Sequence, residues 1–363
     1  MSGTSADGID AALVDINNDQ LHCIDTLSVP FSKNLRKNVL TACALQPNSV
    51  EEVKELDQQL AECYINMVLD LLQANKLSSE DIIAIGNHGQ TVNHSLTTSP
   101  PFSLQIGNAQ NLANATKISV VHDFRSADIA AGGQGAPLAP AIHDHLLRSQ
   151  AEDRVVANLG GIANISILPK DLSQAVTGFD TGPANGLMDY WINKHLGKTY
   201  DQNGVWAATG TVNEPLLKQL LDDDYFKLTP PKSTGRELFN RHWLEEKLEQ
   251  HKTIKSEDVQ ATLCQLTAES LANDIKLYGT NCNKLIVCGG GSHNSNLLQR
   301  IQTELPDAQI SNSSDYGIDP DFMEAILFAW LAYRCINNLS GNLPSVTGAN
   351  KKVILGKIAR PSK

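Results

Sequence analysis

The sequence lacks any excess of basic residues. Its 363 residues include 29 Lys and Arg against 40 Asp and Glu, which gives a net charge of −11 at pH 7. Nucleic acids and anionic lipid surfaces attract proteins with a positive field, so we expect neither as a partner. A small anionic ligand stays compatible with this charge, because it needs only a local group of hydrogen-bond donors.

The sequence also has few cysteines and no long apolar run. The seven cysteines are scattered and none forms a C-x-x-C pair, which argues against a disulfide framework or a zinc site and fits a reducing compartment. No apolar stretch reaches the length of a membrane span, and the N-terminus lacks the basic and apolar regions of a signal peptide. We therefore expect a cytoplasmic protein with no membrane partner.

Several common catalytic motifs are absent as well. We find no G-x-x-x-x-G-K-[ST] loop, no G-x-G-x-x-G fingerprint, no H-E-x-x-H and no G-x-S-x-G elbow. Asp180-Thr181-Gly182 matches the short aspartic-protease triplet, but that chemistry needs two carboxylates that share a proton. A second such triplet is missing, so the protease interpretation is set aside.

The patterns that are present alternate between strands and helices, which predicts an α/β protein. Ile82 to Ile85 reads as a buried strand that leads into the polar segment Gly86–Thr91, and Ile118 to Val121 reads as another. A capping box at Ser49 opens an amphipathic helix that ends near Asn75. The length favours two domains or one large unit with insertions.

Glycine-rich turns follow or join the predicted strands. Glycine lets the backbone approach a ligand closely, and turn amides attract anions, so several such turns suggest a phosphate-binding cleft between two halves. In one of them, Asp180 lies between glycines in a turn that opens into a helix. By itself this residue is either a general base or an aspartate that caps its own turn. The turns are Gly3 to Gly8, Gly160-Gly161, Gly178 to Gly186 and Gly289 to Gly291.

Six ordered motifs, from residue 3 to about residue 183, together resemble the anhydro-N-acetylmuramic acid kinase family, and Phe322-Met323-Glu324-Ala325 fits it too. The motifs are Gly3-Thr4-Ser5-x-Asp7-Gly8-Ile9-Asp10, Gly86-Asn87-His88-Gly89-Gln90-Thr91, His122-Asp123-Phe124-Arg125, Ala131-Gly132-Gly133-Gln134-Gly135-Ala136-Pro137-Leu138, Asn158-Leu159-Gly160-Gly161-Ile162-Ala163-Asn164 and Gly178-Phe179-Asp180-Thr181-Gly182-Pro183.

The resemblance implies a two-domain, actin-like (ribonuclease H-like) sugar-kinase fold with an ATP cleft between the domains. Residues 1–120 would form the N-terminal α/β domain, completed by a helix at about 320–338. Residues 121–319 would form the second domain, and 339–363 a tail that returns to the surface. The family also has a strand before its Gly-Thr-Ser turn, where this sequence has Met1-Ser2. The first strand is therefore expected to be truncated, through a misplaced start or a truly short chain, with an unpaired or frayed sheet edge.

The resemblance further implies an ATP-dependent enzyme of cell-wall recycling. It would convert the amino sugar 1,6-anhydro-N-acetylmuramic acid plus water into N-acetylmuramic acid 6-phosphate, with ATP and Mg²⁺, as a cytoplasmic homodimer. The alternative is an actin-like scaffold that binds nucleotide without phosphorylating sugar. An intact Asp180 and the sugar-side residues favour the enzyme.

Site residues carry over from the matching motifs. Asp180 would be the catalytic base, and Asp7 or Asp10 would hold Mg²⁺. The sugar would be recognised by His88, Gln90, Arg125, Asp128 and Glu324. ATP would be bound by Gly3, Thr4, Ser5, Ala6, Asp7, Gly8, Ile9, Asp10, Gly160, Gly161, Gly289, Gly290 and Gly291.

Overall fold

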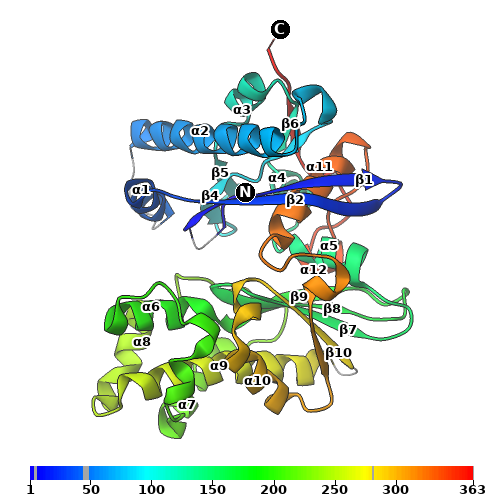
Figure 1. Cartoon of the computed structure of the whole chain (residues 1–363). Helices are drawn as coiled ribbons and strands as arrows, with labels where there is room; N and C mark the ends of the chain where they lie inside the picture. Colours follow the sequence, from blue (N-terminus) through cyan, green and yellow to red (C-terminus); the bar gives the residue numbers. More distant parts are fainter. Residues whose placement is uncertain (4–5, 44–48, 280–281, 363) are drawn as a thin grey trace. The chain divides into compact units, whose positions relative to one another are not determined.

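The computed structural model describes residues 1–3, 6–43, 49–279 and 282–362 and confirms the α/β class (Figure 1). It divides into two compact units. Unit 1 comprises Met1–Ile142 and Phe322–Lys363, and unit 2 comprises His143–Asp321. Within the described residues, no helix is both long and apolar enough to cross a membrane.

Unit 1 opens with an antiparallel hairpin of β1 (Gly8–Asn17) and β2 (Gln20–Pro30). Its two-residue loop has Asn18 and Asp19 at φ 50° and 67°, the left-handed backbone that Asn and Asp tolerate in tight hairpins. Helix α2 (Val50–Ala74) begins at the expected Ser49 capping box. The other elements are α1 (Lys33–Cys43), β3 (Ile85–Gly86), β4 (Gln90–Ser95), β5 (Phe102–Ile106), α3 (Ala109–Thr116), β6 (Val120–His122), α4 (Ser126–Ala130), α11 (Met323–Ile336), α12 (Pro344–Thr347) and β12 (Lys357–Ala359).

Three strands far apart in the sequence form one sheet of unit 1, in the order β12-β6-β3. Because β6 pairs with both of the others, unit 1 continues past the boundary expected at residue 120. The segment 339–363 is likewise part of this unit: β12 is a sheet strand, and Leu355 just before it is fully buried.

One expected strand of unit 1 differs from the structure. The run 82–85 is not a buried strand, since Ile83 is 83% exposed and β3 contains only Ile85 and Gly86. The chain there leaves a short 3₁₀ turn, Ser79–Asp81, whose capping box at Ser78 fixes a bend before the strand. Met1 itself is held, since its backbone N and O both bond to Asp10, but among the described residues β1 pairs with no strand other than β2, as the expected unpaired edge implies.

Unit 2 contains a five-stranded sheet in the order β11-β10-β7-β8-β9. The strands β7, β10 and β11 run parallel, whereas β8 and β9 extend the sheet as antiparallel strands. The long helix α9 packs on β8 and β9 and against α6, α7 and α10 (Figure 1). The strands are β7 (Arg154–Leu159), β8 (Ile162–Leu168), β9 (Thr177–Pro183), β10 (Lys284–Cys288) and β11 (Gln309–Asn312); the helices are α5 (Ala139–Leu147, which starts in unit 1), α6 (Asn185–Leu196), α7 (Glu214–Leu221), α8 (Arg241–Leu248), α9 (Ser256–Tyr278) and α10 (Ser295–Glu304).

Candidate functional site

Asp180 lies in strand β9 and not in the turn that the sequence suggested. It pairs with Asn164 of β8, and helix α6 begins only at Asn185. Glycines around the residue suggested a turn, but here Gly182, at φ +145°, lies beside a break in the strand register between Ala163 and Asn164. The sheet therefore holds the backbone of Asp180, which is a firmer support than a free loop.

The carboxylate of Asp180 is held by a loop that the sequence analysis did not single out. Its Oδ2 accepts hydrogen bonds from the Ser233 hydroxyl at 2.8 Å and from the Thr234 backbone N–H at 2.9 Å. Burial raises the pKa of Asp180, and these two bonds oppose the rise because they favour the charged form. The hydroxyl residues of Pro230–Glu237 were the available signal, but nothing local shows which carboxylate they reach.

A buried cation lies in the same loop. The Lys232 side chain is 1% exposed, and its Nζ is 2.9 Å from Oδ2 of Asp274 and donates to Oδ1 at 3.0 Å. The ammonium also lies over the rings of Phe179 and Tyr225, at 5.7 and 5.3 Å from their centres. Burial is the main influence on the pKa of Asp180 and raises it, and the Lys232 charge opposes this rise.

The glycine turns of unit 2 lie at the ends of neighbouring parallel strands. Gly160 and Gly161 follow β7, and the turn 289–291 follows β10, which pairs with β7 along its whole length. The carbonyls of Gly160 and Gly161 accept the backbone N–H groups of residues 184–186, at the start of α6. The carboxyl ends of parallel strands are where α/β proteins bind ligands, so these turns form a candidate phosphate and nucleotide site.

Not all of these glycines are required for the same reason. A Cβ on Gly289 would lie 2.4 Å from Asn158 Oδ1, and one on Gly291 would lie 2.7 Å from Leu159 Cβ. Both are needed for close packing, and Gly289 also has φ +76°. By contrast, a Cβ on Gly161 would meet no described atom within 4 Å. This open space at Gly161 is what an approaching ligand would need.

In unit 1 the structure brings together three of the expected sugar residues. The guanidinium of Arg125 donates to Nε2 of His88 and, at 2.7 Å, to the carbonyl of Gly135. His88 stacks on Phe328 of α11, with ring centres 4.4 Å apart. Glu324, in the first turn of α11, interacts electrostatically with Arg125. The cluster combines a planar cation, a neutral imidazole and a carboxylate.

The electrostatics of this cluster follow from its limited hydration. Burial lowers the pKa of Arg125 to about 10, and the charge of Glu324 opposes that change. The carboxyl of Glu324 is solvent-accessible, yet the surrounding protein raises its pKa by desolvation; Arg125 opposes the rise, and Asp10 adds to it. Asp10 of β1 therefore belongs to the same charged group.

Asp128, which was expected to contact the sugar, has its side chain inside unit 1, and that contact stays a prediction. Its side chain is fully buried, Oδ2 accepts the N–H of Gly135 at 2.8 Å, and Oδ1 accepts from Asn342 and Thr347 at 2.7 Å each. A Cβ on Gly133 would lie 2.2 Å from Asp128 Oδ2, which explains a glycine there. Asp128 thus joins the glycine-rich loop to the C-terminal segment and presents no open oxygen to a sugar.

Gln90 is also internal in this structure. It is 2% exposed, its Oε1 accepts the Ser2 hydroxyl at 2.5 Å, and its Nε2 donates to the carbonyl of Thr91 at 3.2 Å. Gln90 is the first residue of β4, and its side-chain hydrogen bond with Ser2 connects this strand to the N-terminal segment. The expected sugar contact would require this amide to leave its present partners.

The N-terminal segment only partly matches the expected phosphate loop. Thr4 and Ser5 lie outside the described residues. Gly8, Ile9 and Asp10 already belong to β1, and a Cβ on Gly8 would lie 2.6 Å from the carbonyl of Val29, so this glycine permits close pairing with β2. Of the rest, Ala6 is buried and Asp7 is exposed. Among the described residues no three His, Cys, Asp or Glu side chains group as metal ligands.

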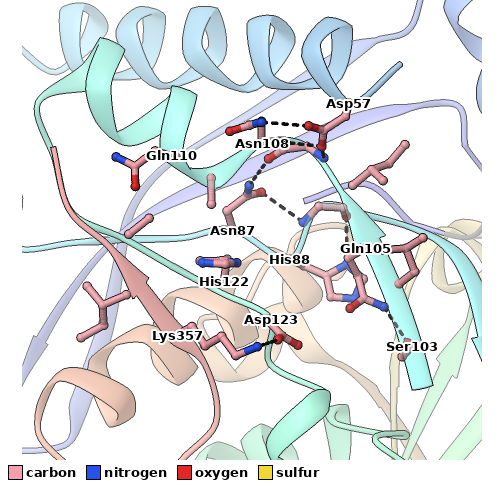
Figure 2. Close-up of a pocket in the computed structure, with 17 residues that line it drawn as sticks. Asp57, Asn87, His88, Ser103, Gln105, Asn108, Gln110, His122, Asp123 and Lys357 are labelled. Atoms are coloured by element: carbon pink, nitrogen blue, oxygen red, sulfur yellow. Dashed lines mark hydrogen bonds and ion pairs between the residues drawn. The ribbon is translucent and has the colours of Figure 1, made fainter. Parts of the chain in front are cut away.

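A pocket of about 640 Å³ lies elsewhere in unit 1 (Figure 2). Asn87 and His122 line it, together with an ion pair in which Lys357 Nζ is 2.7 Å from Asp123. Of the expected sugar residues, His88 alone among those described contributes to its lining. This pocket therefore overlaps the charged cluster only at His88.

Comparisons of the sequence with known proteins agree over nearly the whole chain. Residues 1–361 match the family profile described as anhydro-N-acetylmuramic acid kinase. A protein of that name from Photobacterium profundum is 47% identical over 99% of this chain and 96% of its own length, and one from Pasteurella multocida is 48% identical over 99% and 95%. A solved structure, (R)-2-hydroxyglutaryl-CoA dehydratase component A from Acidaminococcus fermentans, covers 88% of this chain and 95% of its own, at 10% identity and a TM-score of 0.45.

Proposed function

Because the chain belongs to the anhydro-N-acetylmuramic acid kinase family, we propose that Asp180 is the general base of an ATP-dependent kinase acting on 1,6-anhydro-N-acetylmuramic acid. Membership of the family assigns the kinase activity, the role in peptidoglycan recycling and the actin-like sugar-kinase fold. The role of Asp180 rests on one observation: Oδ2 of its carboxylate is held by two donors, while the residue stays only half-buried.

The reaction needs one proton acceptor for two coupled events. Water attacks the anomeric carbon, and the bond from that carbon to the bridging 6-oxygen breaks. The 6-oxygen then attacks the γ-phosphate, whose bond to the β,γ-bridging oxygen breaks to release ADP. A carboxylate that takes the proton from the attacking water makes that water a better nucleophile. Asp180 suits this task because burial raises its pKa above the usual range for aspartate, which makes it a stronger base.

Backbone groups would supply most of the grip on the nucleotide. The turn Gly160-Gly161 fits a phosphate contact, since the space beside Gly161 is open. The turn 289–291, at the end of the neighbouring strand, would border the nucleotide. The segment from Gly3 to Asp10 stays the proposed first phosphate loop, with its hydroxyl contacts assigned to Thr4 and Ser5.

Mg²⁺ is part of this proposal, with Asp10 or Asp7 as the residue that holds it. Mg²⁺ binds proteins through one or two carboxylates and keeps waters and phosphate oxygens as its other ligands, so a site without three grouped side chains fits it. When bound, the ion would neutralise charge on the phosphates. Asp10 is the better placed of the two, because its charge acts on Glu324.

The cluster in unit 1 would recognise the sugar. Arg125 has a planar guanidinium that can bind the lactyl carboxylate, and Glu324 can accept sugar hydroxyls. His88 orients the guanidinium by accepting two of its bonds. We also expect a cytoplasmic homodimer, as the family resemblance implied.

An isotope experiment tests the function. The protein is incubated with ATP, Mg²⁺ and the anhydro sugar in ¹⁸O-water, and the sugar 6-phosphate is analysed by mass spectrometry. We expect the label at the anomeric oxygen of the product. Unlabelled product, or ATP binding with no sugar phosphate, would contradict the mechanism, and the latter would favour the nucleotide-binding scaffold.

Substitution of Asp180 by Asn tests the role of the base. Turnover should fall about a thousandfold or more, while nucleotide binding, measured by calorimetry, should stay unchanged. Asp171→Asn is the matched control. Like Asp180, the exposed Asp171 carboxylate accepts hydrogen bonds from a serine, in this case Ser173. Full activity of Asp180→Asn would remove Asp180 as base.

A further inference from the structure

The segment Lys232–Thr234 runs beside Asp180 and binds it through both backbone and side chain. We propose that this segment is a positioning element that occupies Oδ2 of Asp180 and thereby assigns proton transfer to Oδ1. The inference rests on the proposed function, in which Asp180 is the general base.

The side-chain contacts distinguish the two carboxylate oxygens. Oδ2 accepts the Ser233 hydroxyl at 2.8 Å and the Thr234 N–H at 2.9 Å. Oδ1 accepts no hydrogen bond from the residues that the structure describes, and Asp180 is only half-buried. An oxygen that already accepts two bonds is the weaker proton acceptor, so the proton from the attacking water goes to Oδ1.

The backbone of Asp180 is bound as well. Its N–H donates to the carbonyl of Lys232 at 3.2 Å, and its carbonyl accepts the hydroxyl of Tyr225 at 2.6 Å. Together with the Oδ2 contacts, these bonds restrict both the main chain and the rotation of the carboxylate. A catalytic group that is fixed in this way loses little freedom in the transition state.

The segment is itself anchored in the interior of unit 2. The buried ammonium of Lys232 pairs with Asp274 of α9 and lies over the rings of Phe179 and Tyr225. Ser233 is exposed, and its position is therefore set by its neighbour and not by its own packing. Removing the Ser233 hydroxyl should change the carboxylate contact without changing the core.

The charges near Asp180 predict the direction of a pH effect. Burial raises the pKa of Asp180, and the charge of Glu237 adds to the rise. The bonds from Thr234 and Ser233 and the charge of Lys232 oppose it. Loss of the Ser233 hydroxyl removes one group that favours the charged carboxylate. The pKa of Asp180 should then rise, so the ionised base should be lost at a higher pH as the solution is acidified.

The test compares the pH dependence of kcat/KM for variants of the full chain. In Ser233→Ala we expect the acid limb to move up by about one pH unit, and kcat to fall about tenfold with unchanged nucleotide binding. Ser233→Thr, which keeps a hydroxyl, should largely restore both. Ser173→Ala is the matched control, because the exposed Ser173 hydroxyl donates to Asp171 at 2.7 Å in the same unit.

A wild-type pH profile in Ser233→Ala would overturn the inference, and so would a lower kcat with an unmoved acid limb. Thermal unfolding of each variant checks that the fold is kept. If the alanine variant is unstable, the pH profile of Ser233→Thr, which keeps a hydroxyl, is compared with that of the wild type instead. Activity in Asp180→Asn would instead overturn the proposed base. The two failures are therefore distinguishable.

Discussion

The guanidinium of Arg125 donates two hydrogen bonds to Nε2 of His88, at 3.2 Å from Nε and 2.9 Å from Nη2. Since arginine has no acceptor, Nε2 must be unprotonated, and Nδ1–H donates to the carbonyl of Gly89 at 3.0 Å. Burial and the positive charge of Arg125 hold the pKa of His88 well below its usual range. The imidazole is therefore a fixed neutral acceptor that aims the guanidinium.

This relationship predicts the effect of Arg125→Lys. The variant keeps a positive charge near Glu324 but loses the fork that binds His88 and Gly135. We expect the KM for the sugar to rise about tenfold or more, the KM for ATP to stay unchanged, and unfolding to become easier by about 1–3 kcal/mol. The control is Arg148→Lys, which loses bonds to three carbonyls of unit 2. An equal rise in sugar KM in both variants would contradict the assignment.

Alanine substitutions separate the glycine needed for packing from the glycine that leaves room for a ligand. In Gly291→Ala the new Cβ would lie 2.7 Å from that of Leu159, so we expect a loss of about 1–3 kcal/mol in urea unfolding. In Gly161→Ala the methyl group meets open space, so stability should stay within about 1 kcal/mol of the wild type. Its KM for ATP should nevertheless rise. A stable Gly161→Ala with unchanged ATP kinetics would show that no phosphate approaches there.

Asp128→Asn should be a stability variant and not a binding variant. The amide would place a donor against a site where the carboxylate accepts bonds from Gly135, Asn342 and Thr347. We expect a loss of about 2–4 kcal/mol in the free energy of unfolding, with sugar KM unchanged in the folded fraction. Asp144→Asn removes only a partly exposed ion pair with Arg148 and should cost less than about 1 kcal/mol. A stable Asp128→Asn with a raised sugar KM would restore the role that the sequence suggested.

His143 predicts a pH dependence of stability. It is 1% exposed, its Nδ1 is 2.8 Å from the Ser166 hydroxyl, and burial lowers its pKa from 6.5 to about 4. Between these values the unfolded chain binds a proton that the folded chain does not, so stability is full above about pH 6.5 and falls by about 3 kcal/mol towards pH 4. The wild type should therefore lose about 3 kcal/mol of unfolding free energy relative to His143→Gln between about pH 6.5 and pH 4. The exposed His242→Gln should show no such difference from the wild type, and equal slopes in all three proteins would contradict the prediction.

Local patterns were sufficient wherever one segment decides its own structure. The Ser49 capping box and the apolar spacing after it predicted α2, because helix entry depends on bonds within four residues. The glycine pair after β7 and the three glycines after β10 were likewise visible as turns at strand ends. The buried strand predicted at 82–85 was wrong because burial depends on other segments. A run of apolar residues is buried only if another element covers it, and no described element covers Ile83.

The sequence by itself determined the α/β class and the family, and it singled out Asp180 as a candidate base, since these depend on residue types in a fixed order. Only the tertiary structure decided what each side chain touches. Asp128 and Asp180 both precede glycines in the chain, yet the carboxylate of Asp128 is buried among three donors, whereas Oδ1 of Asp180 accepts no hydrogen bond from the described residues. The partners that make this difference, Thr347 and Ser233, lie far away along the chain. Hydrogen bonds between distant segments exist only once the sheets and loops have folded, so no local pattern contains them.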